Sequence, residues 1–268
     1  MLKLLKLEWS KFSGSSIIRL LGVFFLLFFP LVMYIGMELP KLPSFLPDKL
    51  SFYQFPAIWD YLGYAGNWMV FFFLGVMVIY TITTEVEYKT MRQSIINGMT
   101  RKSYFTSKLL TVTTLSLFAT FYYILVAFIF GFINTESVDM SNLFDSSLMI
   151  PRFFLMSLSY LSFAMMIGLL LKKSGVAVFV YLTYVLFIES AIRRILKWIL
   201  NTELVQYFPM NVTDDLMPLP FYKYAQFLEN MDGPKIVINA PTEAIIATAV
   251  YVVLWVGGIY YLFTRRDL

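Results

Sequence analysis

Long, uninterrupted runs of apolar residues alternate along the chain with short polar stretches. Five of these runs cover residues 20–37, 61–84, 109–135, 153–171 and 244–264. A helix needs about 20 apolar residues to cross roughly 30 Å of hydrocarbon. Because the runs are continuous and do not alternate between apolar and polar positions, as barrel strands do, they predict membrane-spanning helices.

A sixth run, residues 174–188, has only 15 uncharged residues. It would form about 22 Å of helix, which is less than the thickness of the hydrocarbon layer. Either Glu189 lies within the outer leaflet, or the span ends early and the chain turns back. Residues 191–208 keep the apolar spacing of a helix with charges between, so we expect short helices half-embedded in the outer surface. Glu189 and Arg193 are four residues apart, so they can pair on one helical face; alternatively, an ionisable group at membrane depth has a function.

These patterns predict an all-α integral membrane protein with a single transmembrane domain, residues 1–268. The expected spans are residues 17–37, 61–84, 109–133, 152–171, 174–192 and 242–264. Residues 193–240 are expected to form outer re-entrant or interfacial helices and a loop. Residues 1–16 are expected to form an amphipathic helix in the inner interface, since Leu5, Trp9 and Phe12 share one helical face.

The distribution of charge predicts the orientation in the membrane. The inner ends of the expected spans carry 13 of the 21 lysines and arginines but only 4 of the 17 acidic residues. Because an excess of basic residues marks the cytoplasmic face, we expect a multi-pass protein of the cell (inner or plasma) membrane with both termini in the cytoplasm. No small-residue cleavage site follows the first apolar run, so that run is expected to be retained as a span.

Composition excludes several kinds of chemistry. The chain is 59% apolar and only 14% charged, whereas soluble domains are about 25% charged. It contains no cysteine and no histidine, which removes disulfides, thiol chemistry, the usual zinc sites and the commonest general base. Neither a phosphate-binding loop nor a nucleophile elbow occurs. We therefore predict no catalytic residue, no metal site and no cofactor in this chain, which is not expected to be an enzyme.

The connection between the second and third spans, residues 85–108, is here named the coupling segment. It carries seven charges, and it is expected to continue the second span as a helix through Ile96. Asn97-Gly98 should end that helix, and Thr100 should cap the next one. An apolar tip rimmed by charge is the anatomy of a protein interface; alternatively, the charges only enforce topology. The predicted docking residues are Glu85, Glu87, Tyr88, Lys89, Thr90, Met91, Arg92, Ile95, Ile96, Asn97, Gly98, Met99, Thr100, Arg101 and Lys102.

The coupling segment also carries a family resemblance. The pattern Glu85-x-x-x-x-Thr90-x-Arg92-Gln93, then Asn97-Gly98-x-Thr100-Arg101 and Lys108-Leu-Leu, resembles the segment after the second span in ABC-2-type permeases of ATP-binding-cassette exporters. Leu7-Glu8-Trp9-x-Lys11 is similar to the interfacial helix of that family. The resemblance implies that the coupling segment docks in a groove of an ATPase, and that two permeases work with two ATPases.

The predicted function is therefore that of the membrane-spanning subunit of an ABC exporter that moves an amphiphilic, lipid-like or peptide-like substrate outward. ATP and magnesium would be bound by the partner ATPase, and the other partners would be a second permease copy or a related permease and the lipid bilayer, but no nucleic acid. The resemblance also implies a path lined by spans one, two and five. The candidate path residues are Asn67, Tyr181, Tyr184, Glu189 and Arg193. The alternatives are a channel, secondary carrier or structural envelope subunit without ATP, or an ABC-linked force transducer that translocates nothing.

Overall fold

The computed structural model describes residues 8, 9, 12, 14–38, 48–136, 143, 145, 146, 148–220 and 238–265. Within these residues every regular element is a helix, as the apolar runs predict. Six helices are long and apolar enough to cross a membrane. They are α2 (Ser16–Glu38), α3 with η2 and α4 (Ala57–Glu87), α6 (Arg101–Asn134), α8 (Met149–Leu171), α9 with η3 and α10 (Ser174–Leu200), and α13 (Pro241–Arg265).

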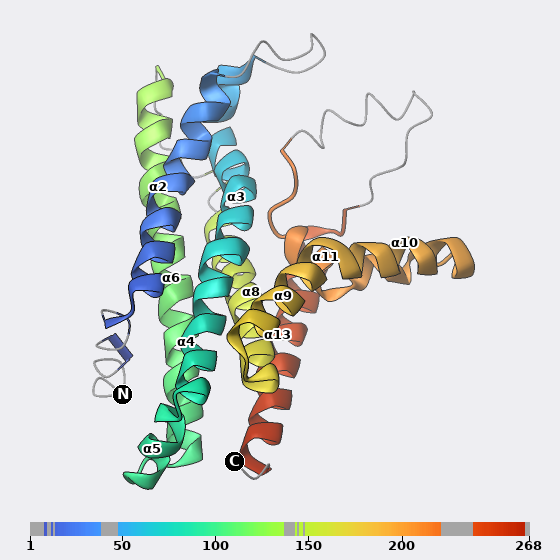
Figure 1. Cartoon of the computed structure of the whole chain (residues 1–268). Helices are drawn as coiled ribbons and strands as arrows, with labels where there is room; N and C mark the ends of the chain where they lie inside the picture. The colour runs from blue at the N-terminus through green and yellow to red at the C-terminus, as the bar shows by residue number, and fades with distance from the viewer. Residues whose placement is uncertain are drawn as a thin grey trace.

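The helix α8 lies at the centre of the bundle, where it contacts α3, α4, α6, α9 and α13 (Figure 1). Its side chains are buried on almost all sides, which agrees with its nearly uncharged sequence. The ring of Phe153 stacks on that of Tyr123 of α6 with 4.3 Å between the ring centroids. The other long helices each keep an apolar face exposed, as expected for helices that meet lipid.

Two of the long helices contain a π-helical turn. In the second span, α3 (Ala57–Met69) passes through η2 (Val70–Gly75) into α4 (Val76–Glu87). In the fifth, α9 (Ser174–Thr183) passes through η3 (Tyr184–Ile188) into α10 (Glu189–Leu200). The two helices touch where Gly75 faces Tyr181, since a Cβ at Gly75 would overlap the tyrosine ring and hydroxyl. Glycine is therefore required there for close packing.

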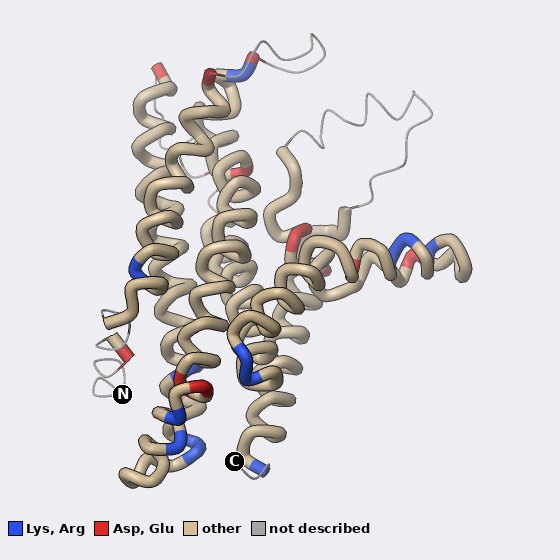
Figure 2. Tube along the Cα trace, viewed as in Figure 1, with Lys and Arg blue, Asp and Glu red and all other residues tan. Residues whose placement is uncertain are grey.

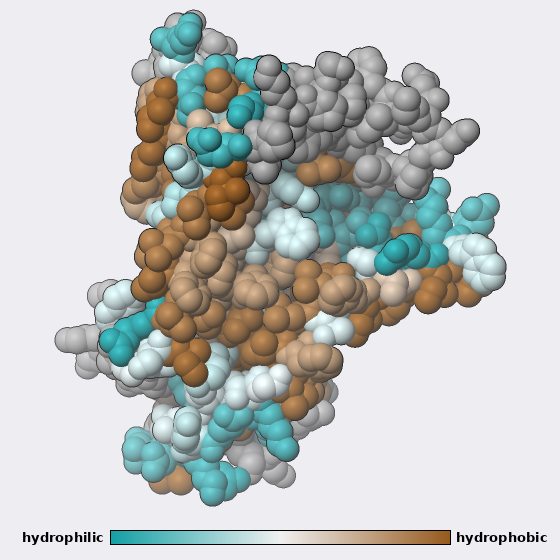
Figure 3. Space-filling model, turned by 45° about the horizontal axis from the view of Figure 1, so that its top comes forward, coloured by the Kyte–Doolittle hydropathy of each residue, from teal (hydrophilic) through white to brown (hydrophobic). Residues whose placement is uncertain are grey.

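The helix α10 runs sideways out of the bundle (Figure 1). Trp198, Ile195 and Ile199 are exposed on it. At 100° per residue, Arg193 and Lys197 lie across the helix from Ile195 and Ile199. Figure 3 shows this division, with an apolar underside and a polar upper side on the projecting arm. This pattern is typical of a helix that lies at a membrane surface, as predicted for the residues after the uncharged run 174–188. The predicted boundary at residue 192 falls inside α10, because Glu189–Leu200 forms one helix.

Shorter helices connect the spans. They are η1 (Lys49–Tyr53), α5 (Thr90–Ile96), η4 (Glu203–Tyr207) and α11 (Pro209–Asp214). Most charged residues gather on these connections, on α10 and at the helix ends, as Figure 2 shows. Of the predicted interfacial helix, Glu8, Trp9 and Phe12 are helical and the rest lies mostly outside the described residues, as do residues 221–237 of the predicted outer loop.

Candidate functional site

The coupling segment is an ordered helix–turn–helix, but it differs in one respect from the prediction. The helix of the second span does not continue through Ile96, because Lys89 adopts a left-handed conformation with φ of 57°. The amide of Lys89 bonds to Val86 O at 3.1 Å, and the hydroxyl of Thr90 donates to Glu85 O at 3.2 Å. The threonine hydroxyl thus replaces the backbone donor that a continuous helix would supply, and α5 starts as a separate helix.

The end of α5 and the start of α6 confirm the prediction. Gly98 has φ of 98°, a left-handed conformation that favours glycine, directly after the last turn of α5. The Thr100 hydroxyl accepts from the amide of Ser103 at 3.1 Å and caps α6. The turn is thus built from the residue types that such a turn requires.

Few of the apolar docking candidates reach the surface. Met91 is buried, and Ile95 and Met99 pack against the core, so the predicted apolar tip is only partly exposed. Ile96 is 78% exposed and Tyr88 75% exposed. The exposed polar candidates are Glu87, Lys89, Thr90, Arg92, Asn97, Gly98, Thr100 and Lys102. The outward face of the coupling segment therefore combines two large apolar side chains with a mainly basic surround.

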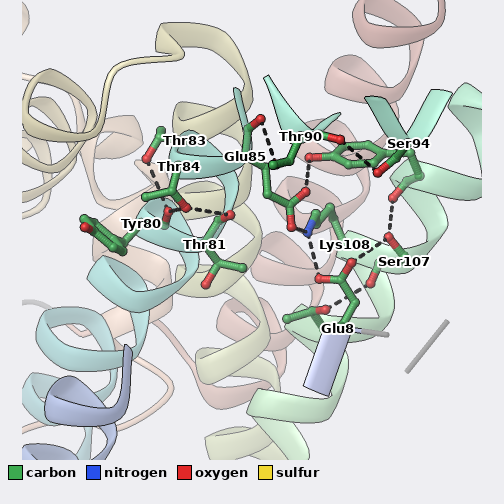
Figure 4. A network of polar contacts seen from close by, with 12 residues as sticks. Glu8, Tyr80, Thr81, Thr83, Thr84, Glu85, Thr90, Ser94, Ser107 and Lys108 are labelled. Carbon is green, nitrogen blue, oxygen red and sulfur yellow. Dashed lines mark hydrogen bonds and ion pairs between the residues drawn. The ribbon is translucent and has the colours of Figure 1, made fainter. Parts of the chain in front are cut away.

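Beneath this face lies a cluster of buried charges, here named the ion cluster (Figure 4). Lys108 Nζ lies 2.7 Å from Glu8 Oε2 and 2.6 Å from Glu85 Oε1. Tyr104 donates its hydroxyl to Glu85 Oε2 at 2.8 Å, and Ser107 donates to Glu8 Oε1 at 3.3 Å. Breaking a buried ion pair by removing one partner costs about 3–5 kcal/mol, so the ion cluster holds the N-terminal segment, α4 and α6 together.

Glu85 and Arg101 make contacts inside the protein that hold the coupling segment in place. Glu85 is only 7% exposed, so its side chain supports the segment rather than presenting a carboxylate on its surface. Arg101 is half-buried and donates to Thr264 O near the end of α13 at 3.5 Å. Glu87 reaches a third element, because its carboxylate accepts from Ser174 N at 2.7 Å and from Ser174 Oγ at 2.9 Å. The coupling segment is thus tied to α6, α9, α13 and the N-terminal segment.

A second polar group surrounds α11, which lies within residues 193–240, where outer helices and a loop were expected. Asp214 Oδ1 accepts from Asn67 Nδ2 at 2.9 Å and from the Tyr160 hydroxyl. Glu189 accepts from the amides of Met210 and Asn211 at 3.0 and 2.8 Å. Its carboxylate is thus used to cap α11, and it makes no close ion pair with Arg193, contrary to the pairing expected from their spacing. Arg193 Nε instead donates to Val205 O at 3.0 Å.

The structure brings together only some of the candidate path residues. Asn67 and Arg193 line one cleft beside α11. Tyr181 is buried against Gly75, Tyr184 packs near Phe163, and Glu189 is buried under α11. Asp214 and Asp215 were not among the candidates, although both line the same cleft. Two adjacent acids far in sequence from their partners carry no spacing signal that could have identified them.

No arrangement suited to a resident metal is found among the described residues, since no group of three or more acidic side chains comes together there. The geometry defines a multi-pass helical membrane protein. Its coupling segment is held firmly on one side and exposes side chains on the other.

The particular family follows from comparison with known proteins. The family described as "ABC-2 family transporter protein" matches residues 4–190, and the chain belongs to it. It is thus an ABC-2-type membrane permease, a transport subunit, as the coupling segment suggested. No curated protein matches the chain.

Proposed function

We propose that this permease moves an amphiphilic, lipid-like or peptide-like substrate outward across the cell membrane, using ATP hydrolysed by a separate ATPase subunit. The ATPase docks on the coupling segment and binds the ATP and magnesium. Both termini then face the cytoplasm, in line with the basic excess at that face. A second copy of the chain, or a related permease, completes the membrane part.

The observation that carries this proposal is the contrast between the two sides of the coupling segment. Its inner side is fixed by the ion cluster and by Glu87, whereas its outer side exposes Tyr88 and Ile96. Large apolar side chains surrounded by arginine and lysine are typical of the centre of a protein interface. A connector that only enforced topology would need basic charge but no such anchoring.

The contacts also supply a route for movement. A displacement of α5 passes first to the end of α4, because the Thr90 hydroxyl donates to Glu85 O. From Glu85 it passes through the ion cluster to α6 and to the N-terminal segment, because Lys108 pairs with both carboxylates. It passes to the fifth span through the three hydrogen bonds that Ser174 donates to Glu87 of α4. Rigid-body shifts of packed helices are a common means by which such switches work.

Retention of the ATPase in the purified complex tests the proposal. The variant Ile96→Asp changes an exposed apolar side chain of α5, so it should release the ATPase and abolish transport without altering the thermal unfolding of the permease. The matched control, Lys197→Glu on α10, reverses an exposed charge away from the coupling segment. It should retain the ATPase and keep its transport activity. If the α5 variant kept the ATPase and full transport, the docking role would be wrong.

A further inference from the structure

A cleft of about 510 Å³ lies beside α11, between the second and fifth spans. This volume falls within the roughly 300–1,000 Å³ of small-molecule sites. Its wall includes Asn67, Trp68, Arg193 and Asp214. The cleft is here named the α11 cleft, and neither the ATPase docking surface nor the ion cluster contributes to it.

One side of the α11 cleft offers hydrogen-bond acceptors. Asn67 is only 4% exposed, and its Nδ2 is used by Asp214. Its Oδ1 is buried and receives no hydrogen bond from the described residues. Such an atom costs free energy unless a donor is supplied, and the nearby Asp214 carboxylate adds negative charge. The wall therefore suits a positively charged group with N–H donors, such as a primary ammonium group.

Arg193 gives the α11 cleft a positive group on another wall. Its Nε donates to Val205 O, but its terminal nitrogens make no hydrogen bond or close ion pair with the described residues. The charges of Glu189, Asp215 and Asp214 act on it from nearby. A guanidinium group binds phosphate or carboxylate strongly through paired donors. Positive and negative groups are thus held apart within one cavity rather than neutralised by direct contact.

The remaining wall is apolar. It includes Trp68, which is 46% exposed, and the side chains of Phe71, Leu186 and Leu219. Arg193 and Ser190 belong to α10, whose exposed apolar face is suited to the membrane surface (Figure 3). The α11 cleft therefore combines a polar interior with an apolar lining beside an interfacial helix.

We propose that the α11 cleft binds the headgroup of a zwitterionic phospholipid that carries a primary ammonium group. The ammonium group contacts Asp214 and Asn67 Oδ1, the phosphate contacts Arg193, and the start of the acyl chains lies against Trp68. An anionic lipid would bring its charge to the carboxylates without an ammonium group to offset it. A lipid with a quaternary ammonium group would lack the N–H donors that Asn67 Oδ1 needs.

Equilibrium binding to the purified full-length chain in detergent tests this proposal. The probes are short-chain fluorescent phosphatidylethanolamine, phosphatidylcholine and phosphatidylglycerol, together with a fluorescent alkylammonium amphiphile. Phosphatidylethanolamine should bind about tenfold more tightly than the other two phospholipids, the effect of about one good polar contact. Equal affinity for the three phospholipids would overturn the proposal.

Variants separate the contacts. Arg193→Gln should weaken phosphatidylethanolamine binding about tenfold and leave the alkylammonium probe unaffected, because only the phosphate contact is lost. Lys197→Gln, on the same helix but bonded to Glu203, should change neither. Asp214→Asn should weaken the binding of both phosphatidylethanolamine and the alkylammonium probe, and its thermal unfolding will show whether it folds. If it does not fold, Trp68→Ala replaces it. That variant should weaken the binding of every probe and preserve the order of their affinities. Unchanged phosphatidylethanolamine binding in Arg193→Gln would refute the site, and none of these results depends on ATPase docking.

Discussion

Lys108 joins three parts of the chain through two carboxylates, Glu8 and Glu85, which lie 100 and 23 residues away in sequence. Its side chain is almost completely buried. At this depth its charge is paired with the two carboxylates, so each partner depends strongly on the others.

Replacing Lys108 by methionine should therefore destabilise the protein by about 3–5 kcal/mol, because two buried carboxylates would lose the ammonium group that pairs with both. The thermal unfolding midpoint in detergent measures the effect. Lys102→Met, on the exposed surface of the same helix, is the control and should lie within about 0.5 kcal/mol of the wild type. Equal midpoints for the two variants would contradict the role of the ion cluster.

Asp215 predicts a dependence of stability on pH. Burial raises the pKa of Asp215 from 3.8 to about 6, although hydrogen bonds from Asn239 and the charge of Arg193 lower it in part. The charge of Asp214 raises it further, and the buried Arg152 donates to the backbone oxygen of Asp215. The folded state thus binds this proton more tightly than the unfolded state does. The contribution of Asp215 is fully present below about pH 4 and is lost as pH rises through about 6.

The difference between these pKa values corresponds to a loss of about 3 kcal/mol over that interval. Denaturant unfolding in detergent across this range should show the decrease, and Asp215→Asn should flatten it. Glu203→Gln, at an exposed acidic residue, should keep the wild-type profile. A wild-type stability that increases from pH 4 to pH 6 would contradict the assignment.

At the scale of elements, local chemistry was readable from the sequence where it involved neighbouring residues. Asn97-Gly98 and Thr100 were predicted because a left-handed stop and a helix cap each depend on one or two side chains. The break at Lys89 was not, since a left-handed lysine has no sequence signal and the compensating Thr90 bond is seen only in three dimensions. The apolar tip was mispredicted in part because Met91 turns toward the bundle.

The contact between the two π-containing helices gives a further prediction. Gly75→Ala should cost about 1–3 kcal/mol, because the new methyl group overlaps Tyr181. The double variant Gly75→Ala/Tyr181→Ala should be destabilised by less than the sum of the two single variants. The difference should be at least about 0.5 kcal/mol. Gly257→Ala in α13, where nothing lies within 4 Å of the added group, should be neutral or slightly stabilising. Additive losses at Gly75 and Tyr181 would show that they do not share a packing contact.

At the scale of the whole molecule, the number and places of the spans were predicted from apolar run length, whereas the assembly of the sites was not. Asn67 and Asp214 lie 147 residues apart, and Glu87 and Ser174 lie 87 apart. Single-sequence patterns identify helices by their period, but contacts between helices depend on packing that no local period encodes. The sideways course of α10 was suggested by its amphipathic sequence, and Figure 1 shows its direction.

Glu87 tests whether docking and movement can be separated. Under the proposed function, Glu87→Ala should keep the ATPase bound but lower transport per ATP hydrolysed about tenfold, because the link to Ser174 is lost and coupling energies are about 1–3 kcal/mol. Glu87→Gln retains an acceptor oxygen, so its transport per ATP hydrolysed should lie between those of Glu87→Ala and the wild type. Release of the ATPase from Glu87→Ala would instead place Glu87 in the docking surface.

The ion cluster also constrains biogenesis. Glu8 and Glu85 precede Lys108 in the chain, so both carboxylates leave the ribosome before their shared cation is synthesised. Until the third span is synthesised, these two carboxylates stay hydrated, and the first two spans cannot pack around them. The N-terminal half can pack only once Lys108 is present. A protein that lacks Lys108 would therefore stay accessible to membrane quality-control proteases.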